Sequence, residues 1–179
     1  MDPTRKFARL EFNRVAARPL GAAGGAAAPF ARTMVEAVVC LANEMVGGAD
    51  RLREDALAYA MMRMQFGKPI ASFQMVQDLL AKMLANVTAC QCLMVRLAQM
   101  DDEGKLGDHH ASLAKAFCTA KSRETVAWGR EILGGNGIVV DYNVARFFAD
   151  AEALYSYEGT YQMQNLIVGK AITGLGAFV

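Results

Sequence analysis

The sequence predicts an all-α protein, an antiparallel helical bundle that follows one short strand. After Pro29, apolar residues recur at three- and four-residue steps through three long segments and two short ones, the period of helices with one buried face. Short polar or glycine-rich turns separate these segments, and helices joined by short turns pack as antiparallel neighbours. The chain has 179 residues, of which 54% are hydrophobic, and this is sufficient for one domain with its own core.

The N-terminal part differs from the rest. Residues 8–13 alternate between apolar and polar side chains, which predicts a half-buried strand. No later segment could pair with it, so its partner strands are expected in a missing segment or in another chain. A linker of glycine and alanine follows at residues 21–28. We therefore divide the chain into residues 1–28, the end of another domain with its linker, and residues 29–179, the bundle.

Turn and cap signals bound the helices, with Ser72 as the expected N-cap of the second. The predicted helices span residues 30–63, residues 73 to the polar turn at 101–105, Asp108 to the glycines at 134–137, residues 144–154, and the segment after Thr160. The expected buried stripes include Met34, Val38, Leu41, Met45, Leu52, Ala56 and Tyr59 in the first helix, Phe73, Val76, Leu80, Met83, Val87, Cys90, Met94 and Leu97 in the second, Leu113, Phe117, Ala120, Ala127 and Ile132 in the third, and Met163, Leu166, Ile167 and Ile172 in the last.

Composition excludes several classes of function. Lys and Arg number 19 against 18 Asp and Glu, so no basic field favours nucleic acid. The adjacent His109 and His110 are typical of a helix start, and Cys90 and Cys92 lack the spacing of a zinc or redox motif, so no metal is expected. No uncharged apolar run is long enough to cross a bilayer. Four dispersed cysteines favour a reducing, cytoplasmic location.

Three local sequences could carry chemistry, and each has a structural alternative. Arg63-Met-Gln-Phe-Gly67 is either an ordinary helix end or the site of an arginine that binds a pyrophosphate. Gly134-Gly-Asn-Gly137 is either a helix stop or a turn that lets a ligand approach the backbone. In Tyr157-Glu-Gly-Thr160, Glu158 is either a carboxylate at a helix start or a general base shielded from water.

Taken in this order, the three sequences resemble the C-terminal domain of the acyl-CoA dehydrogenases, most closely the glutaryl-CoA dehydrogenase branch. The resemblance also includes residues 59–70, residues 127–138 and the ending at residues 166–178, and thus covers essentially the whole chain. It implies a flavoprotein oxidoreductase that uses FAD to oxidise an acyl-CoA at its α,β bond, in catabolism of fatty or amino acids. It also implies that residues 1–28 close a middle β-domain, and that these 179 residues alone do not turn over.

The resemblance assigns roles to individual residues. Glu158 corresponds to the catalytic base that removes the α-proton, and Thr160 to a residue that lines the flavin. The other implied cofactor-binding residues, which hold the FAD of a neighbouring subunit, are Arg63, Gln65, Phe66, Gln74, Gly134, Gly135 and Gly137. A site shared in this way implies a homodimer or homotetramer, or a heteromer with a chain that carries the missing domains.

The sequence also departs from the family pattern. Val35 and Val38 stand where relatives have an acid or amide and then an arginine that help to bind substrate. Glu131 replaces a common glutamine, and Ala149 replaces a basic residue. An alternative function follows, a non-catalytic helical module for oligomerisation or the degraded partner subunit of a heteromeric enzyme.

Overall fold

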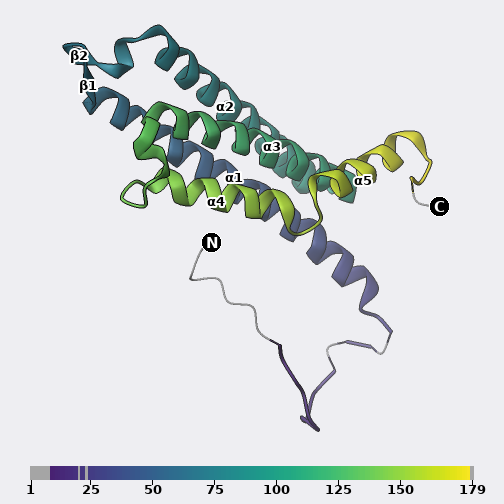
Figure 1. Ribbon diagram of the computed structural model, residues 1–179. Coiled ribbons are helices and arrows are strands. Elements are labelled where there is room, and N and C mark those ends of the chain that lie inside the picture. Colours follow the sequence, from purple (N-terminus) through teal and green to yellow (C-terminus); the bar gives the residue numbers. More distant parts are fainter. Residues whose placement is uncertain (1–8, 20, 23, 178–179) are drawn as a thin grey trace.

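The computed structural model describes residues 9–19, 21–22 and 24–177, and it confirms the helical bundle (Figure 1). A two-stranded hairpin and a short 3-10 turn connect the first two helices, and a second 3-10 turn connects α3 to α4. The elements in chain order are α1 Ala27–Met62, β1 Met64–Gln65, β2 Lys68–Pro69, η1 Ile70–Ser72, α2 Gln74–Asp102, α3 Asp108–Leu133, η2 Gly134–Ile138, α4 Asn143–Ser156 and α5 Tyr161–Thr173.

Helix α3 is the central element of the bundle, in contact with α1, α2, α4 and α5. Figure 1 shows α1, α3 and α4 running side by side, while α5 projects from one end. Removal of apolar side chains from water stabilises this arrangement. The main core cluster consists of Leu41, Met45, Leu52, Ala56, Tyr59, Ala60, Met83, Val126, Ile132, Leu133, Val144, Ala151 and Leu154.

The buried face of α3 differs from the predicted one. Leu113 and Phe117, which were expected in the core, are exposed at 44% and 36%. The face that is buried carries small or polar side chains, because a helix enclosed by four neighbours needs close approach on several sides. Its members include Ala111, Ala114, Lys115, Cys118, Thr119, Ser122, Thr125, Val126 and Gly129.

The last helix, α5, is also less buried than its sequence predicts. Met163, Ile167 and Ile172 are exposed, and Gln164 is the one fully buried residue of this helix. Met34, expected in the stripe of α1, is exposed as well, whereas Val38 is buried. The outer apolar faces of these helices are therefore open in the single chain.

The strand predicted over residues 8–13 is wrong for the part that the structure describes. Residues 9–12 have no regular secondary structure, and Leu10 and Phe12 are exposed; Ala8 lies outside the described residues. No described strand lies beside this segment, so it has no partner for a ladder of backbone hydrogen bonds among the described residues. A lone extended segment without a partner strand among the described residues cannot form a ladder.

The start of α2 also needs correction. Ser72 is not its N-cap, because the Ser72 hydroxyl donates to the carbonyl of Pro69 at 2.8 Å within η1. The helix begins at Gln74 with Phe73 as N-cap and no side-chain cap. The Gln77 amide donates to the carbonyl of Ala71 at 3.0 Å and ties the first turn of α2 to the preceding one.

Helix α2 is, within the described part of the chain, the one helix long and apolar enough to cross a membrane. Only 17% of the residues in its apolar window are buried. One such helix is weak evidence for a membrane span, and α2 packs against both α1 and α3.

Candidate functional site

Glu158 lies in the short turn between α4 and α5. Tyr157 ends α4, and its backbone N–H donates to the carbonyl of Ala153 at 3.0 Å. Thr160 begins α5 as its N-cap, since its hydroxyl accepts from the backbone N–H of Met163 at 3.3 Å. Between them, Glu158 has φ +56° and Gly159 has φ +81°. Glu158 is therefore held in the left-handed region that side-chain-bearing residues seldom adopt.

Two buried polar side chains donate hydrogen bonds to the backbone of this turn. Lys115 of α3 is fully buried, and its ammonium donates to the carbonyl of Tyr157 at 2.7 Å and also to the carbonyl of Gly159. Gln164 of α5 is 3% exposed and donates to the carbonyl of Glu158 at 2.9 Å. Burial lowers the pKa of Lys115, and attraction to the Glu158 carboxylate partly opposes that change.

The Glu158 side chain itself is exposed in this chain. The expected shielding of its carboxylate is thus not provided by the described residues. A carboxylate aimed outward from a rigid turn is suited to meet a ligand held by another domain or chain.

The hairpin between α1 and α2 carries two of the predicted cofactor-binding residues, Gln65 and Phe66, while Arg63 precedes it and Gln74 begins α2. Met64 pairs with Pro69 and Gln65 with Lys68, and the two turn residues, Phe66 and Gly67, both have positive φ, +52° and +78°. Two consecutive residues with positive φ are the requirement of a tight hairpin turn. The sequence predicted that the first helix ends here, and the structure adds a hairpin that the sequence did not predict.

The side chains at this hairpin are mostly exposed to solvent. Arg63 is exposed and forms no ion pair with any residue that the structure describes, and Gln74, at the start of α2, is exposed too. Phe66 is 91% exposed, although its ring lies edge-on to Phe73 with 6.1 Å between centroids. The side-chain amide of Gln65 already donates one hydrogen bond, to the carbonyl of Met64 at 2.7 Å.

The glycines after α3 differ in backbone conformation and in the space around them. Gly134 ends the helix with φ +57° and ψ −130°. Gly137 is buried, and a Cβ there would lie 2.4 Å from the carbonyl oxygen of Arg130. A Cβ on Gly135 would meet nothing within 4 Å. Gly134 is thus required by its backbone conformation and Gly137 by its packing, whereas Gly135 meets neither requirement and has open space around it.

These residues form two groups at opposite ends of the bundle. The Asn136 amide donates to the hydroxyl of Tyr59 at 2.9 Å, which places the glycine turn beside the end of α1 and the hairpin. Figure 1 shows the hairpin and the α3–α4 turn at one end, and α5 toward the other. The structure therefore places the hairpin and the start of α2 at the same end of the bundle as the glycine turn, whereas Glu158 and Thr160 lie in the turn between α4 and α5, toward the other end.

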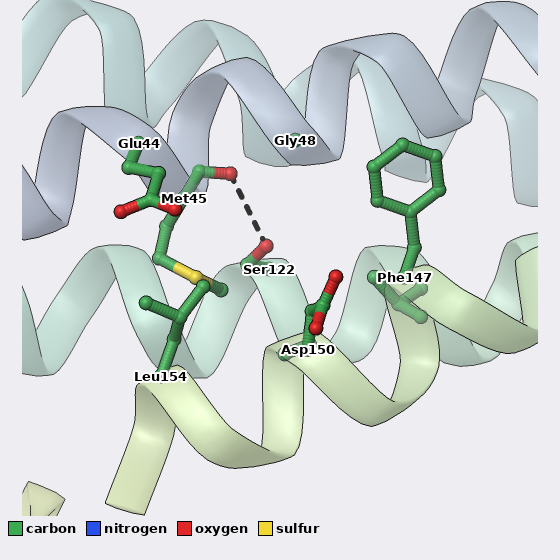
Figure 2. Close-up of a pocket in the computed structure, with 9 residues that line it drawn as sticks. Glu44, Met45, Gly48, Ser122, Phe147, Asp150 and Leu154 are labelled. Atoms are coloured by element: carbon green, nitrogen blue, oxygen red, sulfur yellow. Dashed lines mark hydrogen bonds between the residues drawn. The ribbon is translucent and has the colours of Figure 1, made fainter. Parts of the chain in front are cut away.

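A cavity of about 250 Å³ lies between α1, α3 and α4 (Figure 2). It contains none of the predicted site residues. Figure 2 shows Asp150 and Phe147 of α4 at this cavity, with the Ser122 hydroxyl donating to the carbonyl of Met45 at 3.3 Å. This volume is below the range typical of ligand pockets. Within the described residues, no cluster of His, Cys, Asp or Glu could hold a metal ion.

Lys115 and Gln164 are the residues that sequence reasoning missed. A signal was present for Lys115, which stands between Ala114 and Ala116 and shares a helix face with Ala111 and Cys118. A lysine in such an apolar stripe is seldom buried without a specific partner. Its partner carbonyls come from a segment more than forty residues later, and no local pattern reveals that contact.

The antiparallel helical bundle and its glycine-containing turns can be compared with known domains. Residues 21–173 match the family model for "Acyl-CoA dehydrogenase, C-terminal domain". The chain therefore belongs to the acyl-CoA dehydrogenase family, of which it forms the C-terminal helical domain.

Individual relatives agree with this assignment. A 3-(aryl)acrylate reductase of Clostridium sporogenes is 32% identical over 137 residues, 76% of this chain and 36% of that protein. An acyl-CoA dehydrogenase of Bacillus subtilis is 34% identical over 134 residues, 75% of this chain and 35% of that protein. The crystal structure of glutaryl-CoA dehydrogenase from Mycobacterium smegmatis has a TM-score of 0.79 at 36% identity, covering 83% of this chain and 38% of that one. The chain spans about a third of the curated relatives it matches.

Proposed function

We propose that this chain is the C-terminal part of an FAD-dependent acyl-CoA dehydrogenase in which Glu158 exchanges the α-proton of an acyl-CoA thioester. The observation that carries the proposal is the backbone of Glu158. Arg14, Phe66 and Glu158 are the described residues other than glycine with positive φ. Such conformations persist where surrounding contacts maintain them, and they concentrate at functional sites. Two of the three coincide with residues that the family resemblance assigns to the base and to FAD.

The residues at the hairpin end fit a dinucleotide. The Arg63 guanidinium is exposed and can form paired hydrogen bonds to phosphate oxygens. Phe66 offers an exposed aromatic ring, Gln74 an exposed amide, and Gly135 an unobstructed stretch of backbone. Because Glu158 lies at the other end, the FAD that contacts Arg63 and the substrate that meets Glu158 belong to different sites. An assembly of at least two copies accounts for this separation.

The proposed reaction removes two hydrogens from adjacent carbons. The α C–H bond breaks and its proton passes to the Glu158 carboxylate, while the β-hydrogen leaves with two electrons and a carbon–carbon double bond forms. FAD, when bound, accepts that hydride. In the reverse direction, protonated Glu158 returns the proton to the α-carbon; the relative from Clostridium sporogenes is named a reductase. The chain covers about a third of its relatives, and we expect no turnover from these residues alone.

The cofactor part of the proposal is tested by mixing the purified chain with FAD, separating free from bound by gel filtration and recording flavin absorbance in the protein peak. We expect flavin to co-elute with a dimer or larger species, because the FAD site draws on two copies. A colourless oligomer would contradict a cofactor site formed by this chain alone.

The catalytic part is tested in the flavin-loaded enzyme that contains this chain. Glu158→Gln keeps the shape of the side chain but removes its basicity, and we expect kcat to fall by about 100-fold or more. Glu36→Gln is the matched control, because Glu36 is an exposed carboxylate paired with Arg32. Equal activities of the two variants would contradict the role of Glu158.

A second function is favoured by one specific observation. Val38 is buried and Val35 is half-buried on α1, where relatives carry polar residues that help to bind substrate. A chain without those groups could serve as a non-catalytic oligomerisation module or as the inactive subunit of a heteromer. Retention of FAD together with unchanged turnover in Glu158→Gln would favour this alternative.

A further inference from the structure

We infer that Lys115 and Gln164 are positioning residues that hold the backbone of Glu158 and thereby aim its carboxylate. This inference rests on the proposed role of Glu158. Lys115 is fully buried, and its ammonium donates two hydrogen bonds to the backbone of the turn that contains Glu158. Burial of an ammonium costs free energy unless its N–H donors are satisfied. A buried lysine at this position therefore indicates that its hydrogen bonds to the turn have a function.

The hydrogen bonds bracket Glu158 on both sides. The carbonyl of Tyr157 accepts from Lys115, the carbonyl of Glu158 accepts from Gln164, and the carbonyl of Gly159 accepts from both side chains. Three consecutive peptide planes are thus fixed by side chains from α3 and α5. Because φ and ψ of Glu158 are set by the planes on either side of it, the direction of its Cα–Cβ bond is set as well.

The space around Gly159 shows that the Gln164 side chain packs closely against the turn. A Cβ on Gly159 would lie 2.8 Å from the Gln164 amide nitrogen, and its φ is +81°. A side chain there would displace Gln164 from the carbonyl of Glu158. The Gln164 amide oxygen is buried and accepts no hydrogen bond from a described residue. The amide is therefore oriented for donation to the turn, since the opposite orientation would set its oxygen against two carbonyl oxygens.

A purely structural explanation of Lys115 is that it caps the C-terminus of α4, where a cation is favourable. The two explanations differ in what they predict for catalysis. A cap contributes to stability, whereas a positioning residue changes the chemical step at the base. A small misplacement of a reacting group can reduce a rate by about 100-fold while binding is retained.

The test uses the flavin-loaded enzyme that contains this chain, with Lys115→Met, which keeps the length of the side chain and removes its donors. The probe is a 3-thia-acyl-CoA, in which sulfur replaces the β-carbon and no β-hydride can leave. Exchange of its α-proton with D2O then reports the base alone. We expect the exchange rate of the probe and kcat with an oxidisable acyl-CoA to fall together by about 10- to 100-fold. KM for that acyl-CoA should change less than about threefold, and the flavin content should stay unchanged.

Lys121→Met is the matched control, because Lys121 lies on the same helix and pairs with Glu124. It should leave exchange and kcat at the wild-type level. A second variant, Gln164→Met, leaves Lys115 in place and removes the donor to the Glu158 carbonyl. It should lower the α-proton exchange in the same way, and it keeps the inference testable if Lys115→Met fails to fold.

The outcomes separate this inference from the proposed function. If Glu158→Gln abolishes exchange while Lys115→Met and Gln164→Met retain the wild-type rate, the positioning role is wrong and the base assignment stands. If Glu158→Gln retains exchange, the base assignment itself fails. A loss of thermal stability in Lys115→Met with normal exchange would assign Lys115 to helix capping.

Discussion

Single residues in the turn after α3 show how one sequence motif combines separate physical requirements. Gly134 adopts φ +57° and ψ −130°, which a residue with a Cβ hardly tolerates. Gly137 is in contact with the last turn of α3, where any side chain would overlap the Arg130 carbonyl. Gly135 meets neither condition. The three glycines are therefore not equivalent, and only Gly135 is left for a ligand to explain.

We predict that Gly137→Ala destabilises the chain by about 2 kcal/mol, because the new methyl group would force the turn away from the backbone of α3. The melting temperature should fall by about 4–8 °C, measured by circular dichroism. Gly135→Ala is the control, since its Cβ would enter open space, and its stability should change by less than about 0.5 kcal/mol. Equal destabilisation by both variants would contradict this distinction.

At the level of single residues, the backbone conformation could not be predicted from the sequence. The residue types of Glu158, Arg63 and Phe66 pointed to functional positions through their motifs. The positive φ of Glu158 and Phe66 could not be inferred, because neither residue type favours that region. The burial of Lys115 was equally hidden, since it depends on a contact with Tyr157 and Gly159 across the fold.

At the scale of elements, the start of α3 depends on a histidine. The backbone N–H of Gly107 donates to Nδ1 of His110 at 3.0 Å, which satisfies a group at the helix N-terminus. Nδ1 can accept this hydrogen bond only while it carries no proton. Burial is the main cause that lowers the pKa of His110, and repulsion from His109 adds to it. The helix start is thus built around a neutral imidazole.

We predict that this cap makes stability depend on pH. Because the folded-state pKa of His110 lies below its unfolded value of 6.5, the unfolded chain binds the proton more readily. The stabilisation is fully present above pH 6.5 and is lost as the pH falls through the folded-state pKa. Urea denaturation at about pH 7.5 and about pH 5.5 should show a decrease of at most about 1 kcal/mol from this residue.

His110→Gln provides the comparison for this prediction. A glutamine at the same position can accept from the Gly107 N–H through its side-chain oxygen but does not titrate. His109 and the carboxylates remain, so their contributions cancel between the two proteins. The stability of the variant should vary less with pH than that of the wild type. Identical pH dependence in both proteins would show that His110 does not couple folding to protonation.

Element boundaries were predicted well where turns are marked by composition, and less well where packing decides. The starts of α3 at Asp108 and of α5 after Thr160 agree with the sequence. The hairpin at Met64–Pro69 was not predicted, because each strand has only two residues and leaves no periodicity. The buried face of α3 was missed since hydrophobic size favours Leu113 and Phe117, whereas crowding by four helices selects Ala, Ser and Thr.

At the scale of the whole molecule, several exposed apolar side chains gather at the hairpin end of the bundle. The hairpin end exposes Met61, Met62, Met64, Phe66 and Met75. Exposed apolar groups in such a cluster are typical of surfaces covered by a partner or a ligand. The bundle was predictable because helical periodicity is local, whereas the surfaces between domains and copies depend on groups outside this chain.

The last prediction concerns this end of the molecule. Phe66→Asp places a charge where the proposed site needs an apolar surface and adds repulsion toward cofactor phosphates. We expect the variant to lose FAD in the gel-filtration experiment described above. Ile172→Asp is the control, because Ile172 is an apolar residue exposed at 78%, and it lies on α5. It should retain FAD even if it alters association. Because Phe66 packs only edge-on against Phe73, its replacement should leave the melting temperature nearly unchanged. Equal FAD binding by both variants would place the cofactor away from the hairpin and would require a different explanation for the exposed ring and positive φ of Phe66.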